Sequence, residues 1–160
     1  MRYAWILVDG FSLMYRESKS LPALEAGKSF EARRRLAARL DRIAGALADR
    51  LTLVYDGRGE GGPADEMGDL SIEVVFSPGD QTADTVIERM ALAAPDPSRV
   101  LVVTSDRRER ETVIAAGIAT MGCRDFLREM DRLDRAAATP SSKPWQRTMG
   151  DAWNGRSPRK

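Results

Sequence analysis

Four aspartates stand where predicted elements reach one edge of a sheet, and their carboxylates are the first candidates for chemistry. They are Asp9 in ILVDG, Asp56 in LTLVYDG, Asp84 in QTADTVIE and Asp106 in VLVVTSD. Ligands of open α/β sheets bind beyond the carboxyl ends of the strands. Four converging carboxylates repel one another unless cations neutralise them or some take up protons. Mg²⁺ and Mn²⁺ prefer oxygen ligands, so the residues predict a divalent-metal pocket.

Each of these aspartates also has a simpler structural explanation when it is taken alone. The first two precede glycine in common turn dipeptides, Asp106 suits a helix cap, and Asp84 gains from the dipole of the helix that it begins. Glu88 shares a helix face with Asp84, and its simpler interpretation is a solvated surface. Capping does not require an acid at every element that reaches the same edge. The four aspartates together therefore favour a site.

Short β-rich runs alternate with helical stretches along the chain. The runs cover Tyr3–Val8, Leu51–Tyr55, Ile72–Phe76, Val100–Thr104 and Ile118–Met121. Helices are predicted after an N-cap at Ser29 and over about 82–94, 106–117 and 124–137. Such alternation implies βαβ crossovers. We therefore expect an α/β fold with a mainly parallel five-stranded sheet and helices on both faces.

The 160 residues suit one domain, which we expect over residues 1–137, followed by a flexible basic tail over 138–160. From Ala136 onward the net charge is +4, which leaves the preceding residues at −3. Trp145 and Trp153 lie in this tail and could stack on bases, dock on a partner or fold back. A glycine-rich stretch over 58–69 is predicted to be a loop beside the pocket.

Composition excludes several classes of site. The chain has no histidine, which removes imidazole catalysis and histidine-containing zinc sites, and a single cysteine, Cys123, which removes disulfides within the chain and thiolate clusters. No apolar run is long enough for a signal peptide or a membrane span. We therefore expect a cytoplasmic protein without a membrane partner.

The segments VDGFSLM, LVYDG, QTADTVIE and VVTSDRRERE occur in an order that resembles the NYN domain, a PIN-like nuclease fold, in its YacP-type bacterial branch. The resemblance covers about residues 3–135. It implies an Mg²⁺-dependent endoribonuclease, with cleavage of ribosome-associated mRNA within the branch. The acidic positions of the family fall on Asp9, Asp56, Asp84 and Asp106. Where the family usually has D-G-Y-N, this chain has Phe11 and Ser12.

A metal pocket of this kind suits phosphodiester hydrolysis, because divalent ions lower the pKa of water and clamp phosphate oxygens. We expect Asp9, Asp84 and Asp106 as metal ligands and Asp56 as a supporting ligand or an outer group. The predicted RNA-binding residues are Ser12, Arg107 and Arg108, since arginines beside the pocket can contact phosphates. A further arginine cluster is interpreted as a solvated helix face: Arg35, Arg39 and Arg42.

Two other interpretations stay open. A phosphatase of the aspartyl-phosphate type also places an aspartate after its first strand, but such enzymes usually have D-x-D, and Phe11 occupies the position of the second acid. The other is a non-enzymatic RNA- or ribosome-binding module of the same fold, which Ser12 and the basic tail favour. Thermal stabilisation by Mg²⁺ or Mn²⁺ would distinguish an intact metal site from such a module.

Overall fold

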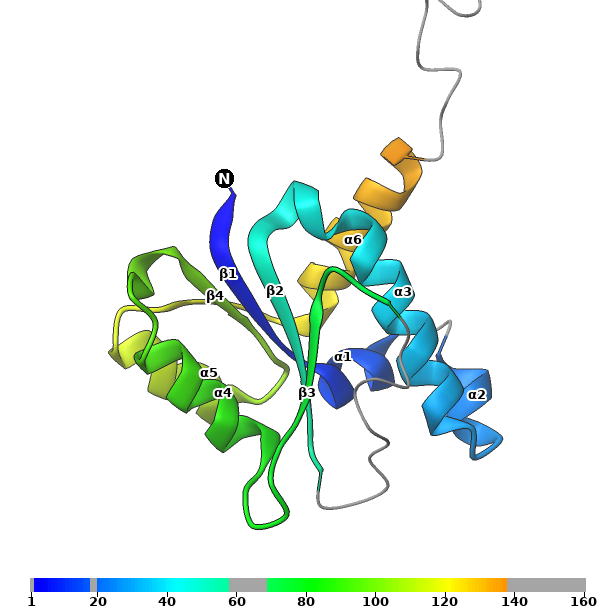
Figure 1. Cartoon of the computed structure of the whole chain (residues 1–160), viewed down its shortest axis with the longest axis horizontal. Helices are drawn as coiled ribbons and strands as arrows, with labels where there is room; N and C mark the ends of the chain where they lie inside the picture. The colour runs from blue at the N-terminus through cyan, green and yellow to red at the C-terminus, as the bar shows by residue number, and fades with distance from the viewer. Residues whose placement is uncertain (1, 18–19, 58–68, 138–160) are drawn as a thin grey trace, which may run out of the picture. The chain divides into compact units, whose positions relative to one another are not determined.

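A five-stranded sheet forms the centre of the computed structural model, which describes residues 2–17, 20–57 and 69–137. The strands are β1 (Tyr3–Asp9), β2 (Ala48–Tyr55), β3 (Glu73–Phe76), β4 (Val100–Val103) and β5 (Ala119–Met121), in the order β3-β2-β1-β4-β5 (Figure 1). All four pairings are parallel. The predicted α/β fold with a parallel five-stranded sheet is therefore confirmed.

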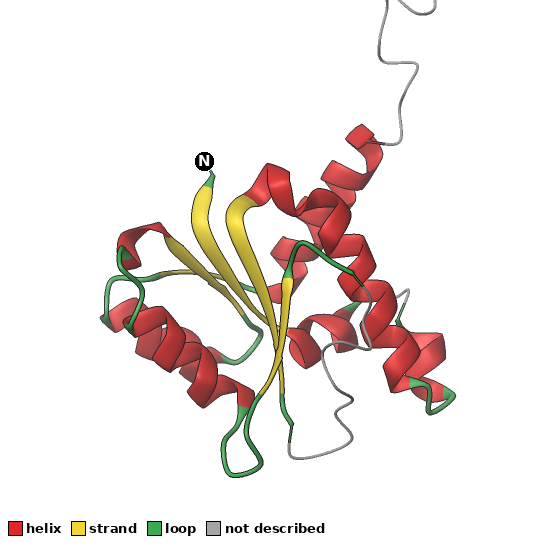
Figure 2. Ribbon diagram, in the orientation of Figure 1, coloured by secondary structure: helices red, strands yellow, loops and turns green. Residues whose placement is uncertain are grey.

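The helices are α1 (Gly10–Arg16), α2 (Leu21–Glu25), α3 (Ser29–Leu47), α4 (Ala83–Leu92), the 3-10 turn η2 (Pro97–Arg99), α5 (Arg107–Ala115) and α6 (Cys123–Ala137). In Figures 1 and 2, α4 and α5 cover one face of the sheet, and α1 and α3 lie on the other. The chain divides into two compact units, Met1–Met130 and Asp131–Lys160. In the second unit the structure describes the helical residues 131–137.

Strand alternation decides which side chains face α4 and α5. Leu7, Val54 and Val102 pack there with Val86, Ile87 and others in one buried cluster, with Trp5 partly buried against it. Because successive strand residues point to opposite faces, Asp9 shares the face of Trp5 and Leu7. The first strand therefore carries its aspartate toward the helices that bring the other acids.

Helix starts follow the local sequence at two of the four predicted helices. Thr82 caps α4 by accepting a hydrogen bond from the Thr85 N–H, and Asp106 caps α5. Gly117, just beyond α5, has a φ of +84°, which glycine adopts at little cost. The N-cap prediction for Ser29 is wrong: Ser29 is the first residue of α3, and the preceding Lys28 makes no side-chain cap.

The sequence did not predict α1 or α2, which are seven and five residues long. Isolated helices of this length are unstable in water, so tertiary packing must hold them. In α1, Leu13 and Met14 are fully buried. The predicted loop over 58–69 falls almost entirely outside the described residues, and the predicted tail over 138–160 falls outside them altogether.

The arginine cluster on α3 is only partly a solvated face. Arg35 and Arg42 are exposed. Arg39 is buried, and its guanidinium lies 2.5 Å from the carboxylate of Glu17, the C-cap residue that follows α1. The Ser20 hydroxyl donates to the same carboxylate. A buried charge is tolerated when it is paired in this way, so Arg39 ties α3 to the segment after α1.

Candidate metal centre

Asp9 ends β1 and at the same time caps α1. Its carboxylate accepts hydrogen bonds from the Ser12 N–H at 3.2 Å and the Ser12 hydroxyl at 2.9 Å. The Thr104 hydroxyl lies 3.5 Å from the same carboxylate, and Thr104 directly follows β4, the strand that pairs with β1. Asp9 is only 7% exposed. These contacts fix the orientation of the carboxylate at the carboxyl edge of the sheet, where ligands of such folds bind.

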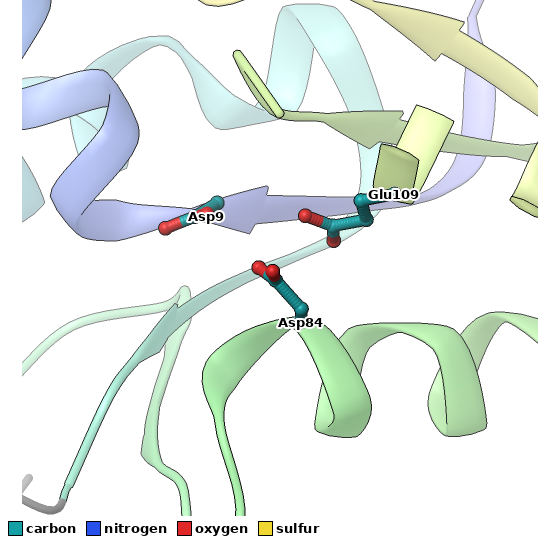
Figure 3. A group of neighbouring side chains, drawn as sticks. All are labelled: Asp9, Asp84 and Glu109. Carbon is teal, nitrogen blue, oxygen red and sulfur yellow. The ribbon is translucent and has the colours of Figure 1, made fainter. Parts of the chain in front are cut away.

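Two further carboxylates meet Asp9 at this edge. Asp84 lies in the first turn of α4, and Glu109 lies in the first turn of α5. One oxygen from each of the three side chains lies within 4.8 Å of the other two. Figure 3 shows Asp84 and Glu109 pointing toward one another beside the end of β1. Three acids from three separate elements therefore converge on one point.

Two of the three acids, Asp9 and Asp84, border an open cavity of about 600 Å³. Its walls comprise Asp9, Phe11, Ser12, Tyr15, Arg16, Asp56, Thr82, Ala83, Asp84 and Ser105. Of the three converging carboxylates, Glu109 is the most enclosed, at 2% exposure, and does not line this cavity itself. The cluster is thus open to a ligand at Asp9 and Asp84 and closed at Glu109.

Burial and mutual repulsion favour protons on this cluster. Burial raises the pKa of Glu109 to about 9, and the adjoining Asp84 carboxyl, with which it can share a proton, adds to the shift. Burial is also the main cause of the raised pKa values of Asp9 and Asp84, with smaller contributions from neighbouring acids. A carboxyl that resists ionisation when alone is one whose charge a cation would stabilise.

The donor set fits a hard divalent cation. When Glu109 and Asp84 are both ionised, neither of the buried carboxylate oxygens of Glu109 accepts a hydrogen bond from the residues that the structure describes. Buried polar atoms are rarely left unpaired unless an ion or water satisfies them. The three candidate ligands offer only oxygen, which suits Mg²⁺ or Mn²⁺. The residues present therefore fit such an ion.

Asp106, predicted as a metal ligand, lies beside this group but is not among the three acids that converge. Its carboxylate caps α5 by accepting from the Arg108 N–H at 2.9 Å and the Glu109 N–H at 3.4 Å. Its negative charge nevertheless raises the pKa values of Asp9 and Asp84, so it is close to both. The structure thus gives Asp106 a capping role and also places its charge at the edge of the cluster.

Asp56 follows β2 and lines the same cavity. The next residue, Gly57, fixes this turn: its N–H donates to the Ser77 hydroxyl at 2.9 Å, and a Cβ at Gly57 would lie 2.1 Å from the Ser77 carbonyl oxygen. Only glycine permits so close an approach. Asp56 is therefore held at the cavity wall.

The predicted RNA-binding residues are divided between two places. Ser12 lines the cavity and holds the Asp9 carboxylate. Arg107 and Arg108 are exposed on the first turn of α5 and do not line the cavity. Glu88, one turn beyond Asp84 on α4, is outside the converging group.

Glu109 is the residue that the sequence reasoning missed. In TSDRRERE it lies three positions after Asp106, a spacing that places both side chains on one side of a helix. That spacing was a usable signal, but two glutamates occur in the segment, and a glutamate at this position of a helix also suits a capping box. Only its burial against Asp84 separates it from Glu111, which is exposed.

No helix in the described ranges is long and apolar enough to cross a membrane.

Known proteins resemble this chain in both sequence and structure. The "Uncharacterized protein YacP" of Bacillus subtilis (strain 168) is 28% identical over 131 residues, which cover 81% of this chain and 76% of that protein. The crystal structure of Rae1 (YacP) from Bacillus subtilis matches with a TM-score of 0.73 at 24% identity, over 94% of this chain and 84% of that one. A mutant of the same protein matches with a TM-score of 0.67 at 24% identity, over 82% and 77% of the two chains.

The structural likeness shows a shared fold, and the sequence family adds to it. The family model of the YacP-like NYN domain matches residues 6–156, which is nearly the whole chain. This match includes the four segments that carry the resemblance to the NYN domain. The chain belongs to the YacP-like NYN domain family and has its nuclease-type fold.

Proposed function

We propose that this protein is an endoribonuclease that cleaves single-stranded RNA with Mg²⁺ or Mn²⁺ held by Asp9, Asp84 and Glu109. The observation that supports this most is the convergence of the three carboxylates within 4.8 Å at an open cavity. The cavity is large enough to admit part of a polynucleotide chain. Its acidic lining would repel phosphate, so RNA can enter only when the charge is neutralised.

Each acid has a separate part in this proposal. Asp9 is oriented by Ser12 and would face the cation from the sheet. Asp84 and Glu109 would hold it from the first turns of two helices, whose dipoles favour negative charge there. The chemistry that a divalent cation supplies in such a site is activation of water and neutralisation of phosphate oxygens.

The remaining predicted residues act around this centre. We propose Asp56 as an outer group on the cavity wall, and Asp106 as a group that fixes the start of α5 and adds negative charge next to Asp9 and Asp84. Arg107 and Arg108 are exposed at the start of the same helix. Phosphates of the RNA on either side of the cut can contact them, which gives affinity with little sequence preference.

Cleavage of an end-labelled single-stranded RNA by the purified protein tests the proposal. We expect cleavage with Mn²⁺ or Mg²⁺, no cleavage with EDTA, and loss of cleavage in Asp9→Asn. The matched control is Asp96→Asn, because Asp96 is an exposed aspartate before η2 and outside the cavity. Cleavage that persists in EDTA, or in a pure Asp9→Asn protein, would overturn the metal-dependent mechanism.

A second candidate function is an RNA- or ribosome-binding module of the same fold. Ser12 favours it, since Ser12 replaces the usual asparagine of the family and uses its hydroxyl on Asp9. A protein that binds RNA and is stabilised by Mn²⁺ but leaves RNA uncut would support this candidate. Co-sedimentation with ribosomes tests the predicted ribosome association, and imaging of a tagged protein in cells tests the predicted cytoplasmic location.

A further inference from the structure

Tyr15 is an exposed aromatic residue on the wall of the acidic cavity. Four large apolar side chains are exposed in the described ranges: Tyr15, Leu21, Leu92 and Ile114. Of these, only Tyr15 lines the cavity, and 60% of its surface is exposed. Single apolar residues on a surface need no explanation. An aromatic ring beside three converging carboxylates needs one. The ring can bind the uncharged face of a ligand whose charged part is held at the acids by a cation.

The Tyr15 ring is backed by other rings that lead into the core. Its centroid lies 6.2 Å from that of Phe11, which in turn lies 5.1 Å from that of Tyr55 in an edge-on contact. Tyr55 is fully buried and stacks on Phe76. Such ring contacts add to the area that the side chains bury. They limit the freedom of Tyr15, so that less entropy is lost when another ring stacks on it.

The backbone also places Tyr15 close to the acids. Helix α1 begins directly after Asp9, and Tyr15 is six residues further on, about 9 Å along the helix. Arg16 follows it and lines the same cavity. The wall formed by α1 thus offers an aromatic face and a positive charge beside the carboxylates. These are the two groups that bind a base and a phosphate in single-stranded nucleic acid.

We propose that Tyr15 and Arg16 form a nucleotide subsite, in which Tyr15 stacks on the base of one RNA nucleotide next to the cleaved bond and Arg16 contacts its phosphate. This inference rests on the proposed function, because it takes the ligand of the cavity to be single-stranded RNA. It assigns the aromatic wall a task that the three acids cannot perform. It also predicts that one nucleotide beside the cut is held by its base as well as by its backbone.

Binding measurements with intact and abasic RNA distinguish the proposed roles of Tyr15 and Arg16. The affinity of the full chain is measured by fluorescence anisotropy with Ca²⁺ in place of Mg²⁺, for an RNA of about ten nucleotides and for a set in which each position in turn lacks its base. Tyr15→Ala should bind intact RNA roughly tenfold more weakly. It should bind the RNA that is abasic at one particular position as tightly as the wild-type protein does. Tyr15→Trp should keep the affinity for intact RNA.

Arg16→Gln should behave differently from Tyr15→Ala. It should weaken binding to every RNA of the set alike and reduce the dependence of affinity on salt by about one counterion. Leu92→Ala, which removes an exposed apolar side chain outside the cavity, is the matched control and should change nothing.

The outcomes distinguish this inference from the proposed function. Cleavage by the wild-type protein tests the function, whereas the comparison of variants on abasic RNA tests the subsite. If Tyr15→Ala binds intact RNA as tightly as wild type, or loses the same factor at every abasic position, the base does not stack on Tyr15 and the inference is overturned. If Arg16→Gln leaves the salt dependence unchanged, its part in the subsite is overturned.

Discussion

The carboxyl groups of Asp84 and Glu109 approach one another from the first turns of two different helices, with Asp9 of the first strand beside them. Neither helix alone gives its acid an unusual environment. The packing of α4 and α5 on one face of the sheet brings them together, and it buries Glu109 almost completely. The electrostatic properties of the site therefore depend on tertiary structure, and several measurements can reveal them.

Without metal, the protein should lose stability as the pH rises. Glu109 has a pKa of about 9 in the folded protein, whereas the ordinary value of a glutamate is 4.5, and the pKa values of Asp9 and Asp84 are also raised. The folded state therefore binds more protons than the unfolded state between about pH 4.5 and pH 9. Its stability is highest at the acidic end of this range and falls by up to about 1.4 kcal/mol per pH unit on account of Glu109.

Urea unfolding in EDTA at about pH 5.5, 7 and 8.5 measures this slope, and saturating Mg²⁺ should reduce or reverse it because the cation replaces the protons. Asp41 and Glu73 have lowered pKa values, so their effect lies below this range. Equal stability in EDTA at about pH 5.5 and 8.5 would show that the cluster ionises without cost.

Glu109→Gln should separate a metal ligand from a structural glutamate. Glutamine is neutral without the proton that Glu109, with its pKa of about 9, takes up on folding, so the metal-free variant should be at least as stable at about pH 8 as the wild type. Stabilisation by Mn²⁺ should be lost, and RNA cleavage should fall roughly a hundredfold or more, since even outer-sphere changes cost 10- to 100-fold. Glu111→Gln, an exposed glutamate on the same helix, is the control. A Glu109→Gln protein that still gains stability from Mn²⁺ would remove Glu109 from the site.

The acids that lie at the ends of strands or the starts of helices could be predicted, because the sequence pattern of each such element is local. Asp9 and Asp84 follow or begin elements with clear patterns, and a parallel sheet brings such positions to one edge. The structure places these two carboxylates together for that reason. Asp56 reaches the cavity wall for the same reason.

Glu109 and the first two helices could not be predicted in this way. The importance of Glu109 depends on burial between α4, α5 and the end of β1, and no local pattern encodes that burial. Helix α1 is too short to show helical periodicity, and it is held by contacts with residues far along the chain, such as Tyr55. The aromatic wall of the cavity therefore could not be predicted from the sequence.

Gly10→Ala should destabilise the protein although alanine favours helices. A Cβ at Gly10 would lie 2.4 Å from the Cε1 atom of the buried Tyr55. One of the two must move, and overpacking of this kind costs about 1–3 kcal/mol. The melting temperature should fall by roughly 2–4 °C for each kcal/mol. In the control Gly45→Ala, the added Cβ meets nothing within 4 Å in α3, so stability should rise slightly. A Gly10→Ala protein as stable as Gly45→Ala would contradict the close packing of α1 on Tyr55.

Asp106→Asn should separate the two roles that the structure gives to this residue. Asparagine caps helices as well as aspartate does, so the bonds from the Arg108 and Glu109 N–H groups can persist. The variant should fold with nearly wild-type stability, while Asp106→Ala should lose about 1 kcal/mol. If the charge of Asp106 contributes to metal binding, Asp106→Asn will weaken stabilisation by Mn²⁺ and slow RNA cleavage at unchanged stability. If Asp106 acts only as a cap, Asp106→Asn will cleave as the wild type does and only Asp106→Ala will be impaired. Melting temperatures with and without Mn²⁺, measured beside cleavage rates for both variants, decide between these two roles.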